Sequence, residues 1–80
     1  MRLDKYLKVS RLIKRRTVAN EACDAGKITV NDKVARASYD VKVGDVIEIT
    51  LGLKSVKVKV TEVKEVVRKE DAATMYEAVV

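Results

Sequence analysis

The sequence predicts a small α+β domain, with two N-terminal helices packed on a small antiparallel β-sheet. Apolar residues recur at helical spacing only within residues 2–25, and from Lys27 onward they alternate with a period of two. The chain has 80 residues, enough for one hydrophobic core. Because the helices precede the strands instead of alternating with them, the α+β class is favoured.

The first helix is expected over residues 2–9. Its apolar side chains recur at i, i+3 and i+4, the spacing of one helical face: Leu3, Tyr6 and Leu7. Asp4 lies in the first turn, where the helix dipole favours an acid. An unbroken helix would turn Leu12 away from the core, so a break is expected near Val9–Ser10. We interpret Tyr6 as a core residue, although it could stack on a base.

The second helix is expected over residues 17–25. Thr17 is the predicted N-cap, and Gly26 supplies the left-handed residue that ends many helices. Between them runs a stripe of small apolar side chains that should face the core: Val18, Ala19, Ala22 and Cys23. Cys23 is interpreted as a small buried hydrophobe.

The strands are expected at 28–30, 46–51 and 56–63, and the 46–51 and 56–63 strands should be joined by a hairpin at 52–55. Asn31 is interpreted as a turn residue, with a contact to RNA as the alternative. Residues 64–73 are charged and expected to be mobile, and residues 75–79 should form a last strand or a short helix. The core must be largely aliphatic, since Phe and Trp are absent; the predicted buried residues are Leu3, Leu7, Ile13, Val18, Ala22, Ile28, Ile47 and Ile49.

The residue inventory excludes most catalytic and metal sites. Histidine is absent, which removes Ser–His, Cys–His and His–metal arrangements, and Cys23 alone cannot form a structural zinc site or an internal disulfide. The three glycines are scattered, so no phosphate-binding loop is expected. We therefore predict no enzymatic activity, no cofactor and no metal. Neither a membrane span nor a signal peptide is visible, and a cytoplasmic location is expected.

Positive charge is concentrated at the N-terminus. Residues 1–36 carry ten Lys/Arg against four Asp/Glu, whereas residues 37–80 carry seven against eight. A one-sided cluster indicates a polyanionic partner. Nucleic acid is favoured over a membrane surface, an acidic protein or a role in solubility alone.

The candidate binding residues are the basic side chains of the first third and the predicted start of the second helix, where free backbone N–H groups attract phosphate. They are Arg2, Lys5, Lys8, Arg11, Lys14, Arg15, Arg16, Thr17 and Lys27. Guanidinium and ammonium groups suit a phosphate backbone better than base edges. The content of arginine and lysine does not by itself distinguish RNA from DNA as the partner.

Five linked motifs lie within residues 2–49: Arg2–Leu7, Ser10–Arg11, Arg16–Ala19, Gly26–Asn31 and Gly44–Ile47. Together they resemble the S4 RNA-binding domain, whose αL-motif fold has the predicted architecture. The resemblance implies one domain over 1–80, with the motif core at 2–49 and a C-terminal hairpin and tail at 50–80. It also implies RNA as the partner, and Arg2 and Arg16 as parts of the RNA-contacting surface.

The opening segment Met1–Thr17 and the tail segment Lys69–Tyr76 are similar to the stand-alone RqcP family of Gram-positive bacteria and, less closely, to the small heat-shock protein Hsp15. The first resemblance implies a monomeric factor on the 50S subunit that contacts 23S rRNA and peptidyl-tRNA, beside an RqcH-type protein that extends stalled chains with alanine. The alternatives are a generic ribosome-assembly or heat-shock factor, and a fragment of a larger S4-bearing enzyme. We expect the fragment to be the weakest of these, since the chain begins with Met1.

Overall fold

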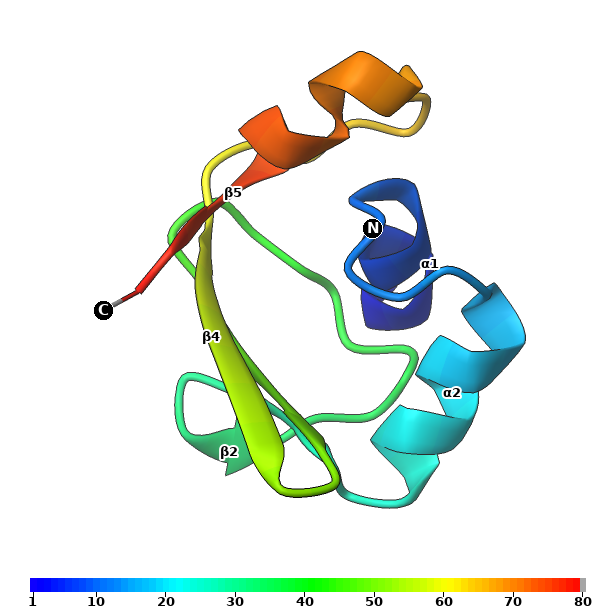
Figure 1. The fold of residues 1–80 in the computed structure, drawn as a ribbon, viewed down its shortest axis with the longest axis vertical. Coiled ribbons are helices and arrows are strands. Elements are labelled where there is room, and N and C mark those ends of the chain that lie inside the picture. The colour runs from blue at the N-terminus through cyan, green and yellow to red at the C-terminus, as the bar shows by residue number, and fades with distance from the viewer. Residues whose placement is uncertain (80) are drawn as a thin grey trace.

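The computed structural model describes residues 1–79 and has two layers, with the helices α1 and α2 on one side of an antiparallel sheet (Figure 1). The helices are α1 (Leu3–Val9) and α2 (Arg16–Asp24). The strands are β1 (Ile28–Val30), β2 (Lys33–Val34), β3 (Val46–Leu51), β4 (Lys54–Val60) and β5 (Tyr76–Ala78). Their order in the sheet is β2-β1-β3-β4-β5. The predicted α+β class is confirmed.

The chain breaks after α1, as the apolar spacing predicts. Ser10 is the C-cap, and Arg11 adopts a left-handed conformation with φ of 63°. The Ile13 N–H then donates to the Leu7 carbonyl at 3.0 Å, which returns the Ile13 side chain to the core. This turn sets the direction from which the chain enters α2.

The start of α2 differs from the prediction. The helix begins at Arg16 with Arg15 as its N-cap, so the prediction of Thr17 as N-cap is wrong. Arg15 makes no side-chain capping hydrogen bond. The side-chain amide of Asn20, in the first turns of α2, donates to Asp4. Val18 is 44% exposed, so its predicted burial is also wrong. The buried face of α2 is narrower than the apolar stripe and comprises Ala19, Ala22 and Cys23.

The sheet packs its apolar face on the helices. β1 and β3 pair with Ile28 opposite Ile49 and Val30 opposite Ile47, and β3 pairs with β4 with Ile47 opposite Val58. These side chains are at most 4% exposed. Burial is confirmed for seven predicted core residues: Leu3, Leu7, Ile13, Ala22, Ile28, Ile47 and Ile49.

The C-terminal third contains more regular secondary structure than predicted. The predicted strand at 56–63 has different bounds. β4 starts at Lys54, because the turn before it contains only Gly52, with φ of 63°, and Leu53, and it ends at Val60. Residues 69–73 of the segment expected to be mobile belong to the 3₁₀ helix η1 (Lys69–Met75), which is followed by β5. Its Met75 is fully buried, and the Met75 carbonyl accepts a hydrogen bond of 2.8 Å from the Tyr6 hydroxyl. The interpretation of Tyr6 as a core residue is therefore confirmed.

Candidate nucleic-acid interface

The centre of the basic N-terminal region is a buried acid. Asp4 is 2% exposed, yet two arginines from different elements bind its carboxylate. Arg2 donates through Nε to Oδ1 at 3.2 Å and through Nη2 to Oδ2 at 3.4 Å, and Nε of Arg16 lies 3.4 Å from Oδ2. We call Asp4, Arg2 and Arg16 the Asp4 cluster. Because both arginine side chains remain about half exposed, each can also bind a ligand from solvent.

Further hydrogen bonds keep Asp4 ionised. Asn20 donates to Oδ2 at 3.3 Å, and the Lys5 N–H donates to Oδ1 at 2.8 Å. Burial by itself raises the pKa of Asp4, but the hydrogen bonds from Asn20, Arg16, Arg2 and Lys5 outweigh it and hold the pKa below its ordinary value. Sequence reasoning assigned Asp4 only to the helix dipole. The sequence does contain one indication of this role: Asp4 is the single acidic residue in 2–16, a segment with seven basic residues.

The start of α2 is open to an anion. Among the described residues, the N–H groups of Arg16, Thr17 and Val18 have no hydrogen-bond acceptor, and the first bond back is from Ala19 to the Arg15 carbonyl. A pocket of about 370 Å³ lies here, lined by Asp4, Arg16, Thr17, Asn20 and Glu21. The unpaired N–H groups and the Arg16 guanidinium can therefore converge on one phosphate.

The start of α1, in contrast, is closed. The Leu3 N–H donates to the Tyr39 carbonyl at 2.8 Å, and the Asp4 N–H donates to the Ala37 carbonyl at 3.2 Å. The Met1 ammonium pairs with Asp40 at 2.7 Å. The segment 37–40 therefore satisfies this helix end, and Arg2 contributes its side chain alone.

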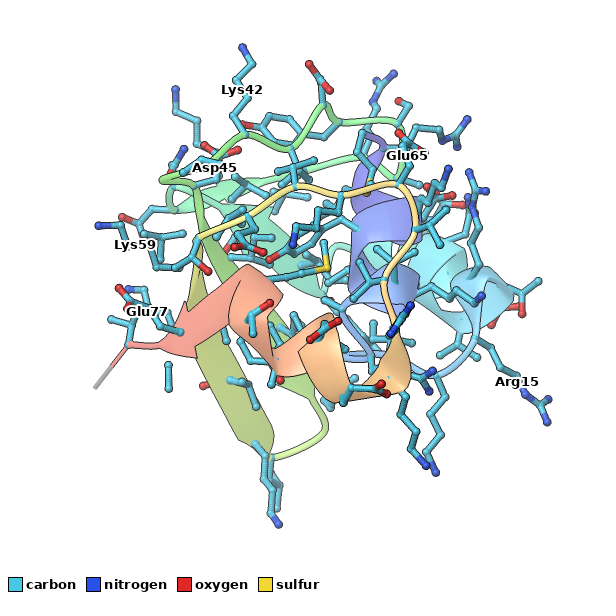
Figure 2. All side chains as sticks on the ribbon, turned by 90° about the horizontal axis from the view of Figure 1, so that it is seen from above. Arg15, Lys42, Asp45, Lys59, Glu65 and Glu77 are labelled. Atoms are coloured by element: carbon cyan, nitrogen blue, oxygen red, sulfur yellow. The ribbon has the colours of Figure 1, made fainter. Side chains whose placement is uncertain are left out.

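The other candidates surround the Asp4 cluster to different degrees. Within residues 1–79, four exposed basic side chains of α1 and the connector form no ion pair: Lys8, Arg11, Lys14 and Arg15. Arg15 projects away from the molecule (Figure 2). Lys5 is paired with Glu65, from the segment before η1. Lys27 follows the C-terminal end of α2, so the structure does not gather it with Arg16.

The residues that could carry other chemistry are placed differently. Cys23 is 3% exposed, and burial, followed by the charges of Asp4 and Asp24, raises its pKa to about 11, as fits the buried hydrophobe that we predicted. Over residues 1–79, no three His, Cys, Asp or Glu side chains come together in a metal-binding group. In that same range, none of the helices has the length and apolar character needed to cross a bilayer.

Comparison with known proteins gives consistent relatives. The S4 domain family matches residues 1–47. The chain is 62% identical over 77 residues to the RQC P-site tRNA stabilizing factor of Halalkalibacterium halodurans, covering 96% of this chain and 88% of that protein. It is 57% identical over 76 residues to the factor of the same name from Bacillus subtilis, covering 95% and 88%.

Solved structures show the same fold. Trimeric heat shock protein 15 of Vibrio cholerae superposes with a TM-score of 0.92 at 26% identity, covering 99% of this chain and 81% of that one. The solution structure of the hypothetical protein HP1423 superposes with a TM-score of 0.85 at 28% identity, covering 100% of this chain and 98% of that one.

Proposed function

The chain belongs to the S4 domain family and, within it, to the RQC P-site tRNA stabilizing factors, and from this we propose that it is a non-catalytic RNA-binding factor that stabilises P-site tRNA in bacterial ribosome-associated quality control. The observation that carries the proposal is the Asp4 cluster beside the open start of α2. On one surface it combines two guanidinium groups, each bound to Asp4, with unpaired backbone N–H groups. These are the donors that suit a phosphate backbone.

The RNA-binding surface consists of the Asp4 cluster and the free cations around it. Arg2, Arg16 and Thr17 form its centre, and Lys8, Arg11, Lys14 and Arg15 extend it along the connector. Lys5 joins when Glu65 releases it, and Lys27 lengthens the surface beyond the far end of α2. Residues 1–80 act as one RNA-binding unit with its motif core at 2–49. Most of the contacts are to phosphate and not to base edges.

Membership of this family supports a specific set of partners. The factor binds the obstructed 50S subunit in the cytoplasm, where it contacts 23S rRNA and peptidyl-tRNA while an RqcH-type protein adds alanines to the stalled chain. It acts as a monomer. Because the Vibrio cholerae neighbour is trimeric, light scattering on the free protein tests this point, with the mass of a single chain as the expected result.

A general assembly or heat-shock role is the weaker reading. The relatives at 57–62% identity are all named as RQC factors, whereas the heat shock protein is similar at 26%. Sedimentation of a cell lysate separates the two roles. The quality-control factor is expected on 50S particles that contain tRNA. Recovery on precursor particles without tRNA would contradict the proposal.

A further inference from the structure

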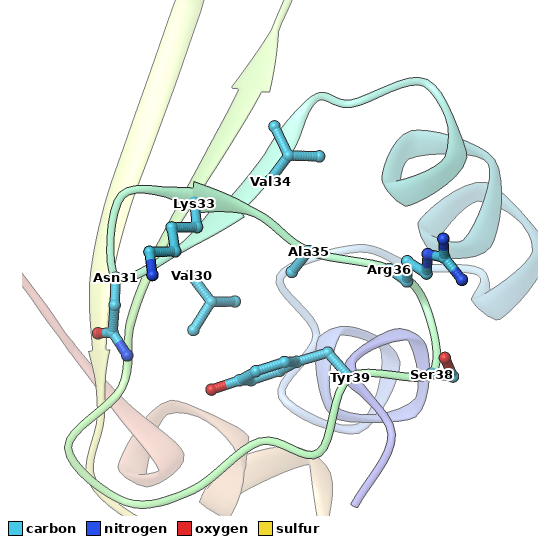
Figure 3. Close-up of a pocket in the computed structure, with 8 residues that line it drawn as sticks. All are labelled: Val30, Asn31, Lys33, Val34, Ala35, Arg36, Ser38 and Tyr39. Atoms are coloured by element: carbon cyan, nitrogen blue, oxygen red, sulfur yellow. The ribbon is translucent and has the colours of Figure 1, made fainter.

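A second pocket lies outside the Asp4 cluster, between the β1–β2 turn and the segment after β2 (Figure 3). Its volume is about 600 Å³, which is within the range of small-molecule sites. Apolar groups of Val30, Val34, Ala35 and the Tyr39 ring form its walls. Polar side chains complete its lining: Asn31, Lys33, Arg36 and Ser38.

The Tyr39 ring is a rigid platform. Its hydroxyl donates to Oδ2 of Asp45 at 3.0 Å, and Oδ1 of the same carboxylate accepts a hydrogen bond of 3.1 Å from Asn31. Asn31 has φ of 53°, which confirms its interpretation as a turn residue. The Tyr39 carbonyl is held by the Leu3 N–H. Since both ends of Tyr39 are fixed, its ring can stack on a flat ligand with little ordering cost.

The only charged residues in the lining of this pocket are basic. None of its lining residues is acidic, and in the described part of the chain Lys33 and Arg36 are exposed and form no ion pair. In Figure 3, Lys33 lies toward the hydroxyl end of the Tyr39 ring and Arg36 beyond its other end. The segment that carries Tyr39 also contacts the start of α1, because the carbonyls of Tyr39 and Ala37 accept the N–H groups of Leu3 and Asp4.

We propose that this pocket holds one unpaired RNA base stacked on Tyr39, with the flanking phosphates bound by Lys33 and Arg36, a role that rests on the RNA-binding function proposed above. An apolar peptide side chain would pack against the apolar walls of the pocket but would leave Lys33 and Arg36 without a counter-charge. A nucleotide supplies the flat base and the phosphates together. Bases in loops and bulges are the parts of folded RNA that proteins stack on aromatic rings.

Two hairpin RNAs test this site: one with a single bulged 2-aminopurine and one with the same stem fully paired. The full-length protein is expected to bind the bulged hairpin about fivefold or more tightly, the scale of one base–aromatic stack. The 2-aminopurine fluorescence should fall as the base stacks. Val34→Glu changes an exposed residue and places a carboxylate at the pocket, so it should abolish this preference. Leu53→Glu adds the same charge at the exposed β3–β4 turn and should keep it.

The double variant Lys33→Ala, Arg36→Ala leaves the walls intact and should reduce the preference as well, with melting curves to confirm folding. A wild-type protein that binds both hairpins equally, or a preference that survives in both pocket variants, would overturn the base site while leaving the Asp4 surface standing. Binding to neither hairpin would overturn the proposed function and the base site together. If Val34→Glu stopped alanine tailing with the preference unchanged, the pocket would belong to a protein partner.

Discussion

Arg2 and Arg16 bind the same buried carboxylate and still face solvent. A carboxylate as buried as Asp4 is costly unless it is paired and hydrogen-bonded, and here the arginines and Asn20 supply those partners. In return the carboxylate fixes two long side chains that would otherwise lose rotamer freedom on binding RNA. We therefore expect Asp4 to affect RNA binding through the positions of its arginines.

The substitution Asp4→Asn tests this positioning role at the level of the residue. It removes a negative charge, so a simple charge effect would strengthen RNA binding. We predict weaker binding, because the arginines lose their ionic anchor, together with a loss of about 1–3 kcal/mol in the free energy of unfolding. Binding to a hairpin RNA is measured below the melting temperature. The matched control is Asp24→Asn, on the exposed part of α2. Tighter binding by Asp4→Asn than by this control would contradict positioning.

The lowered pKa of Asp4 gives a pH dependence with a definite sign. The ionised form is favoured in the folded protein, so its contribution is complete above the ordinary value of 3.8. It is lost as the pH falls through the lower folded pKa. Melting temperatures measured from about pH 6 to about pH 2 should fall for the wild type and fall less for Asp4→Asn. Parallel curves would assign acid sensitivity to other carboxylates.

At the level of residues, the sequence identifies the cations but not their arrangement. Arg2, Arg16 and the other basic side chains can be read from local charge alone. The bond from Asn20 to Asp4 joins residues 16 positions apart across two helices, and nothing in their spacing announces it. For the same reason Thr17 looks like a cap although the helix starts at Arg16.

Among the elements, η1 is docked on α1 by a contact that spans most of the chain. The Tyr6 hydroxyl and the Met75 carbonyl are 69 residues apart in sequence. Periodicity predicts α1, α2, β1 and β3 because their signals are local. It misses η1, since Met75 is buried in the folded core and its carbonyl is bonded to the distant Tyr6.

The substitution Tyr6→Phe tests that docking. It keeps the buried ring and removes one hydrogen bond, so the free energy of unfolding should fall by about 1 kcal/mol. The Met75 carbonyl also accepts N–H groups from Thr61 and Glu62, which limits the loss. Urea unfolding measures the change, and RNA affinity at low temperature should stay the same. An unchanged unfolding midpoint would show that η1 contributes nothing through this contact.

For the whole molecule, binding through phosphates requires a strong salt dependence. Each contact contributes roughly 0.7–0.9 to the slope of log affinity against log salt concentration, and about four to six contacts are expected from this basic surface. Titrations of a structured RNA at several salt concentrations measure the slope. An affinity that does not change with salt would indicate recognition by stacking or base edges instead.

The assignment of the RNA surface is tested by co-sedimentation of variants with 50S particles that carry P-site tRNA, beside a melting curve for each variant. Arg16→Ala and Arg2→Ala should each weaken association by roughly 1.5–3 kcal/mol, the scale of a hydrogen bond to a charged group, and should stop alanine tailing. Each also removes one partner of the buried Asp4 carboxylate, so the melting temperature should fall, and association is measured at a temperature where the melting curve shows the variant to be folded. The control is Lys57→Ala on β4. Lys57 pairs with Asp32 and not with the Asp4 cluster, so this variant should bind normally. Normal binding by Arg16→Ala, or a failure explained by unfolding, would contradict the assignment of the RNA surface to the Asp4 cluster.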